Sequence, residues 1–249
     1  MQELVLRPTR EADTEALSVL FREIYGRERT AEHYRWKYFL PQPPFAGPRL
    51  WVAEDVGRLI GCAGMMTYPF WLDGAEHLGV STCEYHVLPE YRRRGIQSDL
   101  ETRLLEQTRA LAPLYAMCLP NQNLTPLVRK TGYESHFELG WMRQRTWRLA
   151  QWLHPMPKSR TARAVSAPGP EADAVWRRLR DRVNCCLVLS EHWVNVRYVS
   201  CPSISYTYLV AEDNQGPVGF MILGRKRIGK RDELVIGYHL MAADDGETR

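Results

Sequence analysis

The chain has 249 residues, of which 45% are hydrophobic and 25% charged, and its net charge is +4. That length allows one large domain or two small ones, and the composition excludes a mainly disordered or collagen-like chain. The net charge is too small to indicate nucleic acid as a partner. Of the 33 cationic side chains 28 are Arg, whose planar guanidinium suits phosphate, although codon usage in a GC-rich genome accounts for this bias equally well.

The six cysteines form no C-x-x-C pair and no Cys/His spacing typical of zinc sites, so we expect reduced thiols and no bound metal. No stretch reaches the roughly 18 to 20 apolar residues that span a bilayer, and the first residues lack the layout of a signal peptide. These features predict a cytoplasmic protein that has no membrane partner.

Hydrophobic periodicity predicts both strands and helices in the first part of the chain. In chain order we expect a strand over 2–7, a helix around Leu17 and Phe21, an antiparallel meander over 50–88, a helix from about Gln97, a strand over 114–119 and a short helix before Gly132. The run 114–119 is nearly all apolar, which predicts a strand buried on both faces. Asn121 or Asn123 can cap the short helix that follows.

The composition changes between residues 154 and 171, where four Pro occur without apolar periodicity. A stretch of this kind is typical of a domain boundary. We therefore predict a first domain over 1–153, a linker over 154–171 and a smaller second domain over 172–249.

Short segments of the first domain recur in the second in the same order. VAEDVGRLIG at 52–61 aligns without a gap with VAEDNQGPVG at 210–219. The flanking matches are His33-Tyr34 and Lys37-Tyr38 with His192-Trp193 and Arg197-Tyr198, and Tyr85-His86-Val87-Leu88 with Tyr238-His239-Leu240-Met241. Three ordered matches favour duplication of one supersecondary unit, so the second domain is predicted to be a partial repeat of the first.

A basic turn, Arg92-Arg93-Arg94-Gly95, joins the strand that ends at Leu88 to the helix that begins at about Gln97. Unpaired backbone N–H groups and the positive end of the helix dipole meet at such a junction, which makes it an anion site. Gly95 lets a phosphate approach the backbone where a Cβ would block it. A diphosphate is therefore the natural occupant of this turn.

The segment VLPEYRRRGIQSDL, residues 87–100, resembles the V-x-P-E-Y-R-x-x-G-x-G/A motif of the GNAT superfamily of acyl-CoA-dependent N-acyltransferases. Arg7-Pro8, the meander, the strand 114–119, Asn121 and Lys130-Thr131-Gly132-Tyr133 also stand in GNAT order, so the resemblance covers about residues 1–150. It implies an α/β (α+β) fold, with a mixed, mostly antiparallel sheet flanked by helices, and acetyl-CoA or a longer acyl-CoA as cofactor.

The resemblance also implies which residues bind that cofactor. Backbone groups at Val87 would meet its acyl and pantetheine part, the amides from Arg93 to Ser98 would hold its pyrophosphate, and Asn121 would lie along its thiol end. The implied cofactor-binding residues are Val87, Arg92, Arg93, Arg94, Gly95, Ile96, Gln97, Ser98 and Asn121.

The chain departs from the GNAT pattern at two positions. Gln97 occupies the last small position of the motif, where the family usually presents bare backbone. Val128 stands where the family commonly has the Tyr that protonates the departing thiolate, and Tyr133 is the nearest Tyr in sequence. A thiol pKa near 8.5 lets coenzyme A leave tolerably as the thiolate, so a missing acid is survivable.

The acceptor amine needs a base more than the thiolate needs an acid. An alkylamine with a pKa near 10.4 must lose a proton, which costs roughly 4.6 kcal/mol at pH 7. Strand alternation places Ser81, Cys83 and Tyr85 on the side of Val87, and turns Glu84 and His86 away unless a bulge intervenes. With such a bulge or a bridging water, Glu84 is the predicted catalytic base and His86 the second candidate.

The resemblance favours an N-acetyltransferase that acts on a small-molecule or saccharide amine. Residues 34–39, with Arg27 and Arg29 before them, either grip an anionic or sugar-bearing acceptor or simply pack the mouth of the domain. A non-catalytic acyl-CoA-binding or interaction module is the alternative, which Gln97 and Val128 support. An aminoacyl transferase of the peptidoglycan-bridge type ranks third, because it would lack the pyrophosphate loop in both copies.

Overall fold

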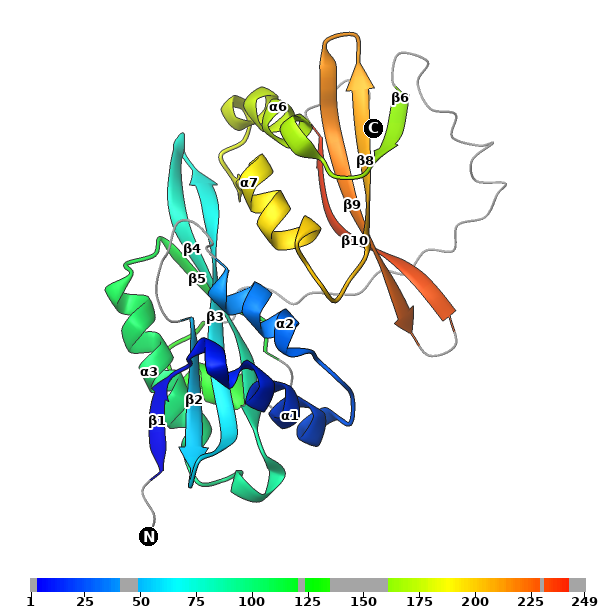
Figure 1. Cartoon of the computed structure of the whole chain (residues 1–249). Helices are drawn as coiled ribbons and strands as arrows, with labels where there is room; N and C mark the ends of the chain where they lie inside the picture. Colours follow the sequence, from blue (N-terminus) through cyan, green and yellow to red (C-terminus); the bar gives the residue numbers. More distant parts are fainter. Residues whose placement is uncertain (1–3, 41–48, 121–123, 135–160, 229–230, 242–249) are drawn as a thin grey trace.

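The structure is a computed structural model that describes residues 4–40, 49–120, 124–134, 161–228 and 231–241 (Figure 1). The first of its two sheets has the strand order β1 (Val5–Pro8), β2 (Leu50–Asp55), β3 (Arg58–Leu72), β4 (Ala75–Val87) and β5 (Tyr115–Cys118). Neighbouring strands are antiparallel except β4 and β5, which are parallel. This confirms the predicted mixed, mostly antiparallel sheet.

Helices cover both faces of the first sheet (Figure 1). One face carries α1 (Thr14–Tyr25), α2 (Ala31–Tyr34) and the π-helical turn η2 (Arg35–Phe39), which follow the short turn η1 (Glu11–Asp13), and the other carries α3 (Ile96–Ala110). Leu17 and Leu20 of α1 and Leu100 and Leu104 of α3 are buried, as their helical spacing predicts. The sheet core therefore lies between two helical layers.

The region after α3 differs from the prediction in two ways. The strand β5 forms, but Ala116 is exposed and the other residues are only half-buried, so the expectation of a strand buried on both faces is wrong. In the described part of the chain β5 pairs with β4 alone, which leaves its other edge without a strand neighbour. Leu124 occupies the N-cap position of helix α4 (Thr125–Lys130) without a side-chain cap, and Asn121 and Asn123, the predicted caps, lie outside the described residues.

The second sheet has the order β10 (Arg231–Met241), β9 (Gly216–Ile228), β8 (Tyr206–Asp213) and β6 (Thr161–Val165). Its helical elements are α6 (Gly169–Leu179), η4 (Arg180–Arg182), α7 (Glu191–Val194) and the π-helical turn η5 (Asn195–Val199). The predicted linker 154–171 is therefore corrected, because β6 and the first turn of α6 lie inside it. The prolines of this stretch do not exclude a short strand, and the division into domains itself stays a prediction.

The two halves share a core. The strand β7 (Cys185–Leu187) belongs to the second half, yet it pairs with residues 70–72 of β3 in the first sheet. Tyr68 and Phe70 of β3 pack among the buried side chains of the second half, and the ring of Trp71 meets that of Trp176 edge to face at 5.4 Å.

Among the described residues, no helix has the length and apolar character needed to cross a bilayer.

Elements of the two halves correspond in order. Each half has a short helix that runs into a π-helical turn, α2–η2 and α7–η5, followed by an antiparallel hairpin, β2–β3 and β8–β9. A later strand carries one extra residue in each half, near Glu84 in β4 and at Gly237 in β10. Glu84 and Gly237 also align in sequence, since each directly precedes a Tyr-His pair. The duplication itself stays a prediction.

Candidate functional site

The strands β4 and β5 part in the middle of the first sheet. They pair from Gly79 with Tyr115 to Thr82 with Cys118, and the pairing then stops while β4 runs on to Val87. On the side of β5, residues 83–87 thus present a backbone edge that no described strand covers. Unpaired N–H and C=O groups at such an edge are available to a ligand that carries amides.

A β-bulge lies next to that edge. Cys62 pairs with His86 but Gly64 pairs with Cys83, so β4 has one residue more than β3 between these pairs. Glu84 has φ +57°, in the left-handed region that favours glycine. The bulge on which the Glu84 prediction depended is therefore present.

The bulge also changes which side chains share a face. The Sγ atom of Cys83 lies 3.5 Å from the hydroxyl oxygen of Tyr38 in η2, on the face that Glu84 also occupies. Tyr85 is on the other face, where the buried Glu101 of α3 contributes to raising the pKa of the Tyr85 hydroxyl, after burial itself. The predicted grouping of Cys83 with Tyr85 and Val87 is therefore wrong, because simple alternation omits the extra residue.

Glu84 is at the centre of a buried charge cluster, and its side chain is only 5% exposed. Its Oε1 atom contacts Lys37 Nζ, and its Oε2 atom lies 2.5 Å from Arg29 Nη1 and 2.7 Å from His86 Nε2. Burial alone would raise the pKa of Glu84, but Lys37, the hydrogen bond to His86 and Arg29 outweigh it and lower the pKa well below its usual value. Glu84 is therefore ionised at neutral pH.

A hydrogen-bonded path leads from Glu84 to the surface. The Nε2 atom of His86 meets Glu84, and its Nδ1 atom lies 3.0 Å from the hydroxyl oxygen of Tyr25. His86 is buried, whereas Tyr25, at the end of α1, is 45% exposed. The structure thus brings the two predicted catalytic residues together and adds Tyr25, which sequence reasoning missed because α1 and β4 are distant in the chain.

The predicted anion site is at the beginning of α3. Gly95 is the N-cap with φ +82°, and no side chain caps this end. Arg93, two residues before Gly95, also has a positive φ, +65°, and left-handed residues in a turn are typical of backbone concavities that bind anions. Ile96 is buried, whereas Ser98 is exposed. A φ of +82° is itself a reason for a glycine here, and the approach of a phosphate to Gly95 stays a prediction.

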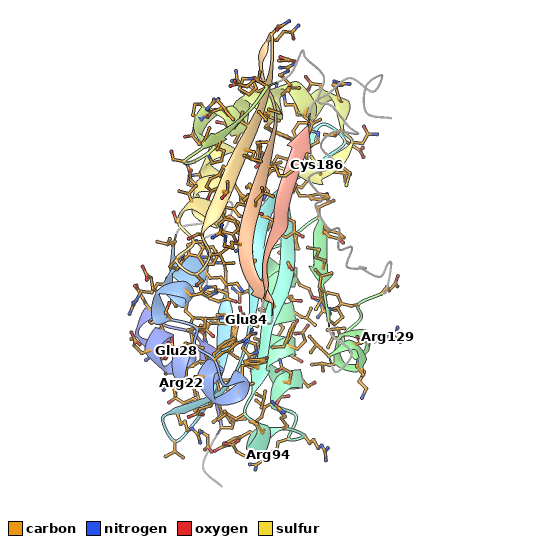
Figure 2. All side chains as sticks on the ribbon, turned by 90° about the vertical axis from the view of Figure 1, so that its right-hand side faces the viewer. Arg22, Glu28, Glu84, Arg94, Arg129 and Cys186 are labelled. Carbon is orange, nitrogen blue, oxygen red and sulfur yellow. The ribbon has the colours of Figure 1, made fainter. Side chains whose placement is uncertain are left out.

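Two of the three arginines of the turn donate hydrogen bonds to backbone carbonyl groups. Arg92 Nε donates to the Val87 carbonyl at 3.1 Å, and Arg94 donates to the Glu90 carbonyl at 2.8 Å. Arg92, Arg93 and Arg94 are all exposed. Figure 2 shows Arg94 near one end of the molecule and Glu84 deep in its middle, so the turn and the charge cluster are separate sites on one strand and its loop.

Gln97, the first departure from the GNAT pattern, points its amide inward. Its Nε2 atom is buried and has no hydrogen-bond partner among the described residues. The side chain therefore does not stand over the exposed end of the helix. One turn further along α3, Glu101 is fully buried, and burial raises its pKa.

Val128, the second departure, is a core residue that is 3% exposed. After α4 the chain reverses at Gly132, which has φ +95° as its place after the helix predicts, and Tyr133 N–H donates to the Val128 carbonyl. The Tyr133 hydroxyl then lies 3.4 Å from Thr82 Oγ1, where β4 and β5 part. Burial raises the pKa of Tyr133 to about 12. Asn121 lies outside the described residues.

In the described ranges, no group of three or more His, Cys, Asp and Glu side chains is arranged to hold a metal ion. The charge cluster around Glu84 contains one carboxylate and one imidazole beside two cations. Its composition suits proton transfer and the binding of charged groups.

Several solved structures share the fold at low sequence identity. A GCN5-related N-acetyltransferase from Kribbella flavida superimposes with a TM-score of 0.66 and 17% identity, covering 96% of this chain and 57% of that one. One from Anabaena variabilis gives a TM-score of 0.69 and 13% identity, covering 97% and 59%. Saccharomyces cerevisiae N-myristoyltransferase with bound myristoyl-CoA gives 0.61 and 13%, covering 98% and 67%.

This chain thus spans less than two thirds of the length of the first two of these proteins. Comparison with curated proteins gives no match. The family model described as an acetyltransferase (GNAT) domain matches residues 5–135, which is more than half of the chain. The match includes the bulged strand, the arginine turn and the beginning of α3. The chain belongs to the GNAT acetyltransferase family.

Proposed function

We propose that this protein is an acyl-CoA-dependent N-acyltransferase that transfers an acetyl or longer acyl group directly to an amine. The observation that carries the proposal is a coincidence along β4. Within residues 82–87 the strand leaves β5, bulges at Glu84 and enters the loop to α3. A thioester, an acceptor and an anion can thus be held along one short segment.

The described residues fit an acyl-CoA. The uncovered edge of residues 83–87 offers N–H and C=O groups to the amides of a pantetheine arm. The uncapped end of α3, with Gly95 and the exposed Arg93, suits the diphosphate. Val87 joins the two parts, since it ends β4 and its carbonyl accepts from Arg92. Asn121 stays a prediction from family resemblance.

Transfer to an amine forms a C–N bond, breaks a C–S bond and removes one proton from nitrogen. We assign that proton to Glu84, which is ionised and takes it up on its carboxylate until the product leaves and the proton returns to solvent. His86 orients the carboxylate: with its ring proton on Nε2 it donates to Glu84, and its Nδ1 accepts from the Tyr25 hydroxyl. The cations Arg29 and Lys37 assist, because nearby positive charge lowers the pKa of an amine.

The sulfur must gain a proton when the C–S bond breaks. We assign this role to Tyr133, whose hydroxyl lies at the parting of β4 and β5 beside Thr82. With a pKa raised to about 12 the hydroxyl keeps its proton throughout the neutral range. The family position Val128 then supplies only packing, and the tyrosine that follows α4 takes over the function.

Two measurements test this function. Calorimetry should give acetyl-CoA at least tenfold weaker binding to an Arg93→Ala/Gly95→Asp variant than to the wild type, while the control Arg177→Ala on α6 binds like the wild type. Thiol release from acetyl-CoA should be observed with members of a panel of small-molecule and amino-sugar acceptors. Binding without thiol release for any amine would favour the non-catalytic alternative, and equal affinity in the loop variant would overturn the site.

A further inference from the structure

The second half contacts the segment that supplies Lys37 to the charge cluster. Residues 196–203 contact the segment that contains α2 and η2: Trp36 Nε1 donates to the Val196 carbonyl at 2.7 Å, and His33 Nδ1 lies 2.6 Å from Ser203 Oγ. The guanidinium of Arg197 stands 5.3 Å from the ring centroid of Trp36. Lys37, which forms an ion pair with Glu84, is the next residue after Trp36. Arg197 thus approaches the site from the other half of the chain.

Positive charge exceeds negative charge at this place. Arg29 and Lys37 share the carboxylate of Glu84. Arg197 is half-buried, and within the described ranges it contacts the rings of Trp36 and Tyr198 and no carboxylate. A half-buried guanidinium without a counter-ion is costly unless a ligand supplies one.

The charges near His33 shift its pKa in the direction expected of a net positive field. Burial first, and then Arg29 and Lys37, lower the pKa of His33 to about 4, and Arg197 acts in the same direction. Glu84 acts in the opposite direction but does not reverse the shift. The ring is therefore neutral at pH 7, and the surrounding space favours an anion over a cation.

We propose that the acceptor of the transfer is an amine that also carries an anionic group, a carboxylate or a phosphate, and that Arg197 of the second half binds this group together with Arg29 while the amine faces Glu84. The inference rests on the proposed function and names its substrate class. It gives the second half a role in specificity, and it disfavours polycationic acceptors, whose extra charges would meet Arg29, Lys37 and Arg197.

Matched pairs of acceptors test the proposal. β-Alanine with β-alanine amide tests a carboxylate, and 2-aminoethyl phosphate with ethanolamine tests a phosphate. In at least one pair, wild-type kcat/KM should be tenfold or more higher for the anionic member. Arg197→Gln should raise KM for that member about tenfold with kcat nearly unchanged, and alter the neutral member less than twofold. Arg197→Lys should recover part of the loss, and Arg177→Gln should behave like the wild type.

Equal rates for both members of each pair, or a preference for neutral or polycationic amines, would overturn the inference while leaving N-acyl transfer intact. If the wild type releases no thiol with any amine, the proposed function fails, and binding still decides the inference. Calorimetry with 2-aminoethyl phosphate and β-alanine in the presence of coenzyme A should then give about tenfold weaker binding for Arg197→Gln than for the wild type. Equal binding of both probes, or no binding, would refute the anion site.

Discussion

Replacing Glu84 tests whether this residue is held in a strained backbone by its charge. Glu84→Gln removes the charge but keeps the side-chain shape, and leaves Lys37 and Arg29 facing each other in a site where the carboxylate was only 5% exposed. Removing one partner of a buried ion pair costs about 3–5 kcal/mol of unfolding free energy. We expect a loss of that size at pH 7 by urea denaturation.

Glu84→Gly removes the same charge but also relieves the backbone at φ +57°. A non-glycine residue in that region costs about 1–2 kcal/mol of stability. Glycine avoids this cost but lowers the stability by about 0.5–1 kcal/mol, because it has more conformational freedom in the unfolded chain. Glu84→Gly should therefore be more stable than Glu84→Gln by about 1 kcal/mol. Both variants should lose most of their kcat/KM, because neither has the carboxylate.

The outcome that refutes this reasoning is a Glu84→Gly variant less stable than Glu84→Gln. Lys37→Met supplies a control, since it should be destabilising in the wild type and less destabilising when combined with Glu84→Gln. pH gives a second readout. The folded pKa of Glu84 is lowered, so its contribution to stability is present above the unfolded value near 4.5 and is lost as pH falls toward the folded value. Glu84→Gln should lack that part of the acid-side loss.

Three further variants separate binding, chemistry and packing. Gly95→Ala should cost about 1 kcal/mol of stability, because φ is +82° and a Cβ there meets nothing closer than 3.9 Å, yet it should weaken acetyl-CoA binding at least tenfold; unchanged affinity would contradict the anion site. Tyr133→Phe should lower kcat about 100-fold or more without altering KM for acetyl-CoA, and an unchanged kcat would exclude this tyrosine as the acid. Gly79→Ala would place a Cβ 2.3 Å from the Tyr68 ring, which should cost about 1–3 kcal/mol of stability; a melting temperature within 1 °C of wild type would show that the ring moves aside freely.

Local rules predicted the fold and the backbone geometry of the turn before α3 well, because both depend on neighbours in sequence. Residues 50–88 alternate and turn as an antiparallel meander should, and the helix begins next to Gly95 as the change of period indicated. The positive φ of Gly95 and of Gly132 follows from the turn each closes. Backbone geometry of this kind is set within a few residues.

The charge cluster could be predicted only in part. Glu84 and His86 were identified from the strand before the loop. Their partners Tyr25, Arg29 and Lys37 lie near α1, α2 and η2, about 50 residues earlier in the chain, and no spacing rule relates them to β4. Glu101 of α3 is a second example, because this charged residue is fully buried and its position in the helix does not indicate that. A pattern of charged residues tells which helix face is polar on average, and it cannot tell which member of that face meets another element.

The pairing of β7 with β3 has a consequence for how the protein is made. Translation completes β3 at Leu72 and β4 then pairs with one edge of its end, but the strand that pairs with the other edge is not synthesised until residues 185–187. Until then Tyr68 and Phe70, which pack in the core of the second half, have no partners there, and an open strand edge with exposed rings is prone to aggregate. The GNAT domain of this protein is therefore not a portable module: cutting the chain between the halves would leave the first half with an open edge.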